Sequence, residues 1–68
     1  MESTYKVIEL IGTSPNSWEE AAKNAVETAK KSLQDLRIAE AVDFDMKVEE
    51  GNVVAFRTKV KVSFKFKE

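Results

Sequence analysis

The sequence predicts an α+β fold with the element order β-α-β-β, in which a three-stranded antiparallel sheet wraps around one helix. Three patterns predict it. β-branched and aromatic residues concentrate near the N-terminus, apolar residues recur at helical spacing in the middle, and polar and apolar residues alternate toward the C-terminus. The whole chain, residues 1–68, is short enough to be predicted as a single domain.

The first strand is predicted over residues 4–11, TYKVIELI, which are rich in β-branched and aromatic side chains and too few for an amphipathic helix. Apolar side chains fall on both faces of such a strand. Val7 and Ile11 share one face, and Ile8 and Leu10 share the other. We therefore expect another part of the protein to pack against each face.

A helix is predicted from Trp18 to Asp35. Ser17, followed three residues later by Glu20, fits a capping box, in which each side chain accepts a hydrogen bond from an unpaired backbone N–H group of the first turn. The apolar positions at helical spacing are Trp18, Ala21, Ala22, Ala25, Val26, Ala29, Leu33 and Leu36. Because this stripe is rich in alanine, the helix is expected to lie unusually close to the sheet.

The remaining residues are predicted to form a long hairpin. From Ile38 onward, the even positions of the first arm are mostly apolar, while the odd positions are small or charged. One face of the second arm carries Val54, Phe56, Thr58, Val60, Val62, Phe64 and Phe66, and basic side chains occupy most of the other face. The second arm is expected to be the central strand of the sheet.

The pairing of the two arms can be narrowed further. A two-residue loop without a bulge would place the polar side chains of one arm on the same face as the apolar side chains of the other. The hairpin therefore requires a loop with an odd number of residues or a β-bulge. A loop of residues 50–52 pairs Asp45 with Arg57. A loop of residues 49–51 pairs Asp43 with Arg57 instead. In both registers an acidic arm lies beside a basic arm on the face turned away from the helix.

The length of these arms predicts self-assembly. Natural strands average about 5–6 residues, and both arms are much longer. One helix cannot cover them, and an exposed strand edge invites pairing with other chains. We therefore expect other copies of the chain to cover part of the sheet.

The composition excludes several classes of protein. The 68 residues include no cysteine and no histidine, which removes disulfides, a cysteine nucleophile, the usual general base and the commonest metal ligand. We therefore predict that the protein is not an enzyme. The 11 basic and 12 acidic residues give a net charge of −1, which does not favour binding to nucleic acid. No long apolar stretch or secretory signal is present, so no membrane partner and a cytoplasmic location are expected.

The acidic residues of the first hairpin arm are candidate metal ligands. Asp43, Asp45 and Glu49 offer carboxylate oxygens of the kind that calcium prefers. The alternative is that the same carboxylates form ion pairs with the basic residues of the hairpin, such as Lys59. A symmetric assembly that brings several acidic arms together would favour the metal site.

Nearly the whole chain resembles the dodecin family. The resemblance rests on YKVIELIGTSPNSWEEAAKNAVETAKKSL, LRIAEAV and VAFRTKVKVSFKF, within residues 5–66. Its most specific part is a strand ending in Gly12-Thr13-Ser14 that leads directly into a capped helix. The resemblance implies a hollow homododecamer with 23 symmetry. It also implies that flavins such as riboflavin or FMN bind between subunits, for storage rather than catalysis.

Two positions of the implied flavin site are substituted. Ile38 stands where typical dodecins carry the tryptophan that stacks on the flavin, and Arg57 stands where they carry a glutamine that hydrogen-bonds the flavin edge. Isoleucine has no aromatic face, and arginine only donates hydrogen bonds. Trp18 lies at the other end of the helix and does not replace the missing ring.

Three hypotheses follow from the resemblance. The leading one is a non-enzymatic homododecameric cage that binds or stores a small flavin-type ligand. The first alternative is a calcium-binding cage, because dodecins that lack the tryptophan have been associated with calcium. The second alternative is a structural assembly without a physiological ligand.

Overall fold

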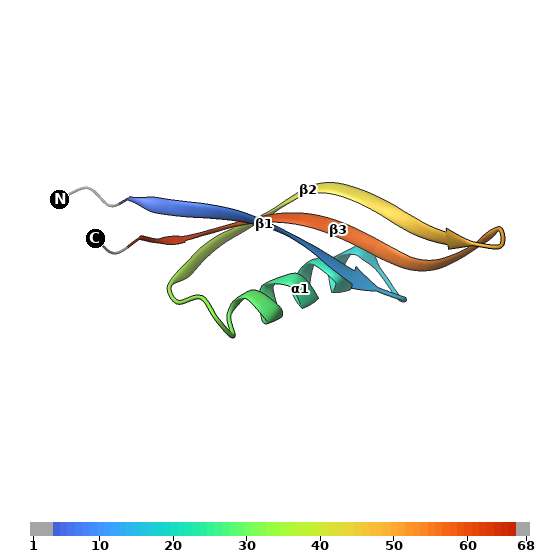
Figure 1. Ribbon diagram of the computed structural model, residues 1–68, viewed down its shortest axis with the longest axis horizontal. Helices are drawn as coiled ribbons and strands as arrows, with labels where there is room; N and C mark the ends of the chain where they lie inside the picture. The colour runs from blue at the N-terminus through green and yellow to red at the C-terminus, as the bar shows by residue number, and fades with distance from the viewer. Residues whose placement is uncertain (1–3, 67–68) are drawn as a thin grey trace.

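The computed structural model, which describes residues 4–66, has the predicted element order. The elements are β1 (Tyr5–Ser14), α1 (Trp18–Ala29), β2 (Leu36–Glu49) and β3 (Asn52–Lys65). All strand pairs are antiparallel in the order β1-β3-β2, and the helix covers one face of the sheet (Figure 1). The predicted fold class and the central position of the third strand are confirmed. Residues 1–3 and 67–68 of the predicted domain lie outside the described residues.

The helix begins as predicted, but only half of the capping box forms. The backbone N–H of Glu20 donates a 3.0 Å hydrogen bond to Oγ of Ser17, the N-cap residue. The Glu20 carboxylate does not return to the N-cap. It accepts hydrogen bonds from the Ser14 hydroxyl and, at 2.8 Å, from the side-chain amide of Asn16. The carboxylate therefore ties the end of β1 to the start of the helix.

The helix ends at Ala29, so the predicted end at Asp35 is wrong. The backbone N–H of Lys31 donates to the carbonyl of Thr28, three residues back, and this tightens the last turn. Asp35 then takes a φ of 60°, a left-handed conformation that Asp tolerates better than most residues, and the chain turns into β2. Leu36 continues the helical spacing in the sequence, but it begins a strand.

The predicted close approach of the helix to the sheet is confirmed. Ala21, Ala25 and Ala29 are buried, with exposed fractions of 0%, 5% and 4%. A Cβ atom added to Gly12 would lie 1.9 Å from the backbone oxygen of Ala21, so β1 and α1 touch backbone to backbone. The fully buried Val60 of β3 lies at the centre of the core beneath the helix.

The hairpin satisfies the predicted register through a bulge. The chain reverses through a two-residue turn, Glu50 and Gly51, with φ angles of 51° and 79°. The register then shifts between Lys47 and Val48, which restores the facing of the rest of the arm. Beyond this bulge, Asp45 pairs with Arg57, as one of the two predicted registers requires.

A further bulge, this one in β2, determines which face of the sheet the first half of that strand occupies. The register shifts between Ala41 and Asp43, so Val42 has no partner on β3. We call the face of the sheet turned away from α1 the outer face. Ile38 and Glu40 consequently lie on the outer face together with Asp43, and the predicted alternation of even positions from Ile38 onward is wrong there.

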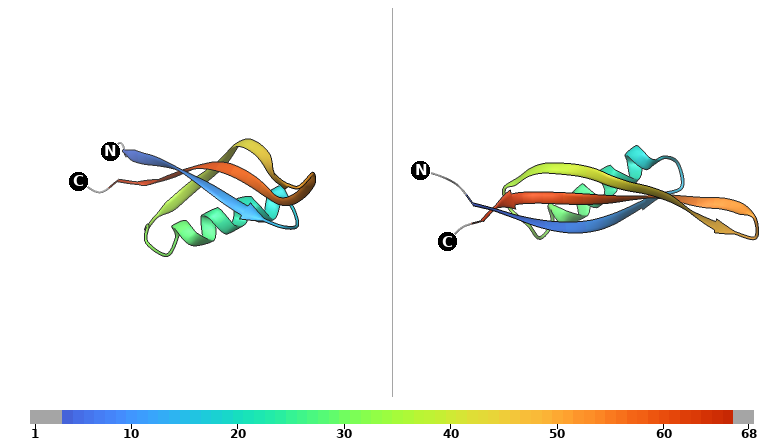
Figure 2. Two further views of the ribbon diagram at one scale, coloured as in Figure 1. Left: turned by 45° about the vertical axis from the view of Figure 1, so that its right-hand side comes forward. Right: turned by 90° about the horizontal axis from the view of Figure 1, so that it is seen from above.

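The hairpin extends far beyond the helix. β1 pairs with β3 only as far as Ser14 opposite Phe56, and we call residues 46–55, beyond this point, the distal arm. The distal arm projects past the helix in both Figure 1 and Figure 2, and the molecule measures 53 × 20 × 15 Å. The exposed large apolar side chains are Tyr5, Val7, Ile11, Trp18, Ile38, Phe44, Met46, Val48, Val53, Val54 and Phe66. Among the described residues, the helix is neither long nor apolar enough to cross a membrane.

Candidate functional site

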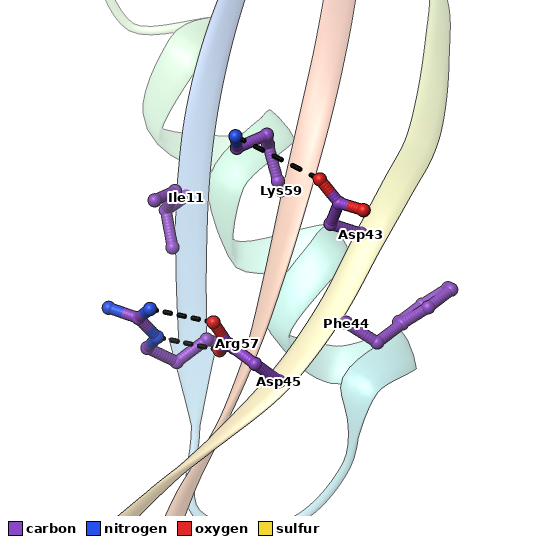
Figure 3. Close-up of a pocket in the computed structure, with 6 residues that line it drawn as sticks. All are labelled: Ile11, Asp43, Phe44, Asp45, Arg57 and Lys59. Atoms are coloured by element: carbon purple, nitrogen blue, oxygen red, sulfur yellow. Dashed lines mark hydrogen bonds and ion pairs between the residues drawn. The ribbon is translucent and has the colours of Figure 1, made fainter.

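Three of the predicted site residues meet around one hollow on the outer face. The hollow has a volume of about 300 Å³ and is lined by Ile11, Asp43, Phe44, Asp45, Arg57 and Lys59. All three strands contribute: β1 supplies an apolar side chain, β2 supplies the carboxylates and β3 supplies the basic groups. Figure 3 shows two ion pairs crossing from β3 to β2 within this hollow.

The first ion pair joins Asp45 and Arg57 in a bidentate arrangement. Nε and Nη2 of Arg57 each donate a 2.7 Å hydrogen bond to one carboxylate oxygen of Asp45. These hydrogen bonds lower the pKa of Asp45 below its usual value and raise the pKa of Arg57. Both side chains are about half exposed, so the pair fixes the orientation of the two groups more than it stabilises the fold.

The second ion pair is looser and leaves a carboxylate accessible. Nζ of Lys59 lies 3.9 Å from the Asp43 carboxylate, which is beyond hydrogen-bonding distance. The Asp43 side chain is 75% exposed. Asp43 is therefore the predicted ligand residue that is most open to a second partner.

Glu49, the third predicted metal ligand, is not part of the hollow. It lies near the hairpin turn, where its carboxylate is 3.4 Å from Nζ of Lys47. Within residues 4–66, no group of three or more His, Cys, Asp or Glu side chains is placed to hold a metal ion. A single chain therefore brings Asp43 and Asp45 together but does not add Glu49 to them.

Ile38 lies on the same face as the hollow but far along the sheet. It is 65% exposed and pairs with Ser63 of β3, which is also the partner of Val7 in β1. Ser63 and Arg57 are six residues apart on β3, which corresponds to about 20 Å at 3.3 Å per residue. Within one chain, Ile38 and Arg57 cannot contact the same side of a small ligand.

Trp18 supports the hollow from behind. Its indole ring packs edge-on against Phe44 and Phe56, with ring centroids 5.9 Å and 5.2 Å away. Its Nε1 donates a 3.0 Å hydrogen bond to the backbone carbonyl of Asp45. The ring thus lies on the helix side of β2 and fixes the backbone from which the Asp45 side chain reaches the outer face.

Sequence reasoning missed two features of this face. Ile11 was assigned to a face of the first strand, but its place beside Lys59 depends on the register between β1 and β3. Glu40 joins the outer face only because of the bulge at Val42, and it pairs there with Lys61. The one sequence signal for the bulge is that Ala39 and Ala41, which flank Glu40, are the small apolar residues expected beneath a helix.

Comparison with known proteins gives a consistent result. The family model described as Dodecin matches residues 4–67. The chain is 48% identical to calcium dodecin of Mycobacterium tuberculosis over 65 residues, which cover 96% of this chain and 92% of that protein.

Solved structures of similar proteins have the same fold. Dodecin from Streptomyces davaonensis superposes with a TM-score of 0.92 at 28% identity, with all of both chains covered. Dodecin from Streptomyces coelicolor superposes with a TM-score of 0.91 at 33% identity, and the match covers 97% of this chain and 94% of that one. The crystal structure of M. tuberculosis calcium dodecin, described as having a novel calcium-binding site, superposes with a TM-score of 0.86 at 48% identity. The match covers 96% of this chain and 93% of that one.

Proposed function

Because the chain belongs to the dodecin family, we propose that it is a cytoplasmic, non-enzymatic homododecameric cage that binds calcium as its small ligand. The observation that carries the choice of ligand is the open carboxylate of Asp43, which lies beside Asp45 on the outer face. The 48% identity to a calcium dodecin supports the same choice.

The donor chemistry of the hollow fits calcium, but one chain offers too few ligands. Calcium is usually bound by 6–8 oxygen atoms. Asp43 is available, whereas Asp45 is held by Arg57 and Glu49 lies elsewhere. We infer that carboxylates of neighbouring copies complete the shell, because a symmetric assembly that places β2 beside one of its axes repeats the acidic strand around that axis.

The exposed surface supports assembly into a cage. Many large apolar side chains are exposed on both faces of the sheet, and the helix covers only the middle of β3. Both outer strands also leave one edge without a partner within the described chain. Apolar surface and open strand edges of this extent are typical of chains that pack against further copies of themselves.

The flavin-type ligand implied by the family is the second candidate, and two observations weaken it. Ile38 offers an exposed aliphatic surface without an aromatic ring, so each stacked pair loses about 0.5–1.5 kcal/mol. Arg57, which stands at the glutamine position, is already occupied by Asp45. We therefore expect riboflavin to bind this protein weakly.

A calcium titration tests the proposal. We expect millimolar calcium to raise the thermal unfolding midpoint of the chelator-treated wild type and of Asp35→Asn, a matched control away from the hollow. Asp43→Asn should lose this response. No response in the wild type would refute calcium binding. Near-complete quenching of riboflavin fluorescence would support the flavin cage instead, and an assembled protein that responds to neither ligand would support the purely structural role.

A further inference from the structure

The distal arm, residues 46–55, has one apolar face that its own helix does not cover. Met46, Val48, Val53 and the bulged Val54 are between 42% and 57% exposed. The opposite face carries the ion pair of Lys47 and Glu49. A ribbon of two strands is only marginally stable in water by itself. The arm therefore has the character of an element that packs against another surface.

An apolar groove of about 290 Å³ lies elsewhere on the chain, between α1 and β2. Its lining residues are Ala22, Lys23, Val26 and Glu27 of the helix, Ala39 and Ala41 of β2, and Val60 at the centre of the sheet. The groove exists because β2 lies farther from the helix than β1 and β3 do, as Figure 2 shows. The small side chains of β2 leave this gap unfilled.

We propose that the distal arm of one copy docks its apolar face into the α1–β2 groove of a second copy. This inference rests on the proposed self-assembly and identifies the surfaces that carry part of it. The arm points away from the groove of its own chain in Figure 1, so the contact joins two copies. Both surfaces are apolar, so docking would remove the exposed apolar face of the arm and the exposed apolar lining of the groove from water at the same time.

The charges at the two surfaces are complementary. Glu27, on the rim of the groove, is paired with Lys30 at 3.0 Å, whereas Lys23 takes part in none of the ion pairs among the described residues. Glu50, at the tip of the arm, is likewise outside these ion pairs. Docking of the arm brings a free carboxylate toward a free ammonium group.

The contact is heterologous, because the arm and the groove are different surfaces of the same chain. Repeated contacts of this kind close into rings when the rotation between neighbours divides a full turn. A cage with 23 symmetry contains such rings at its three-fold axes. An arm-to-arm contact would instead place two acidic tips near each other and leave the groove empty.

Cross-linking through introduced cysteines tests the contact, because the natural chain has none. We expect the double variant Ala22→Cys/Val53→Cys, treated with a short bismaleimide, to give covalent dimers and trimers on a denaturing gel. Each single variant should stay monomeric on the gel. Cross-linking of Val53→Cys alone would show an arm-to-arm contact and overturn the proposal.

The same experiment separates the docking contact from self-assembly itself. A native mass that shows an assembly, together with no cross-linking of the double variant, would refute the docking contact and leave the cage. A monomeric native mass for the wild type would refute both.

A charge exchange gives an independent test. Lys23→Glu and Glu50→Lys should each weaken subunit association about tenfold, because like charges then meet at the contact. The combined variant should recover association, whereas the control Lys31→Glu, which lies outside the groove, should leave it unchanged. Native masses over a dilution series measure association, and Trp18 fluorescence reports whether dissociated chains stay folded. Failure of the combined variant to recover association would refute the contact.

Discussion

The indole Nε1 of Trp18 donates a 3.0 Å hydrogen bond to the backbone carbonyl of Asp45. The two residues are on opposite faces of the sheet: the ring lies on the helix side, and the Asp45 carboxylate points to the outer face. One hydrogen bond therefore links the packing at the start of α1 to the position of an ion pair on the other side of β2.

Replacing Trp18 with Phe should separate this hydrogen bond from aromatic packing. Phe retains the edge-on contacts with Phe44 and Phe56 but cannot donate to the Asp45 carbonyl. We expect a loss of about 1 kcal/mol in the free energy of unfolding, measured by guanidinium denaturation followed by circular dichroism. The control Tyr5→Phe, at an exposed position, should change little. Equal stability of Trp18→Phe and the wild type would show that the hydrogen bond does not contribute.

The two glycines should respond to alanine for different reasons. Gly12→Ala inserts a Cβ atom 1.9 Å from the Ala21 oxygen, so the helix must move, at a cost of about 3 kcal/mol. Gly51→Ala meets no atom within 4 Å, but it places alanine at a φ of 79°, at a cost of about 1 kcal/mol. Denaturation of both variants measures the difference. A Gly12→Ala variant no less stable than Gly51→Ala would contradict the backbone contact.

The Asp45–Arg57 pair should make stability depend on acid pH. Because the hydrogen bonds from Arg57 lower the folded-state pKa of Asp45, the stabilisation is present above the unfolded-state pKa of about 4. It is lost as the pH falls through the lower folded-state pKa. In Arg57→Gln, this part of the acid dependence should become smaller. Thermal unfolding between pH 2 and pH 6 tests this expectation, and parallel curves for the two proteins would contradict it.

Ser14 should control the ionisation of Glu20. The Ser14 hydroxyl is the main cause, followed by Asn16, of the lowered pKa of this carboxyl group. In Ser14→Ala, the pKa should move back toward its usual value, and the stability that the ionised carboxylate supplies should be lost at a higher pH. Carboxyl chemical shifts in an NMR titration measure the pKa directly. An unchanged Glu20 titration would show that the hydroxyl does not act on it.

Most of the fold could be predicted because its periodicities are long and clear. The alternation of β3 and the alanine stripe of α1 depend on local geometry that the sequence displays directly. The end of the helix could not be predicted in this way. Leu33 and Leu36 continue the helical spacing, and nothing local shows that Asp35 adopts a left-handed conformation and turns the chain into a strand.

The candidate site was predictable only where it depends on one pair of strands. Hairpin register placed Asp43 and Asp45 opposite basic residues, and the structure agrees. The position of Ile11 needs the register of a strand distant in sequence. The face of Ile38 depends on a bulge that composition does not reveal. The remaining ligands of the proposed calcium site could not be predicted, because we infer that they lie on other copies, whose arrangement is not visible in the sequence of one chain.

The bulge at Val42 has a consequence for how this surface can evolve. Deleting Val42 alone would remove the bulge and leave every other residue of β2 on its present face, because Ala41, on the helix side, and Asp43, on the outer face, would then follow one another as neighbours do in a regular strand. A register without the bulge that keeps Val42 would instead turn Ile38 and Glu40 toward the helix, and Ala39 and Ala41 outward. The bulge thus absorbs one surplus residue, so the strand can lose a residue at this position without exchanging the chemistry of its outer surface.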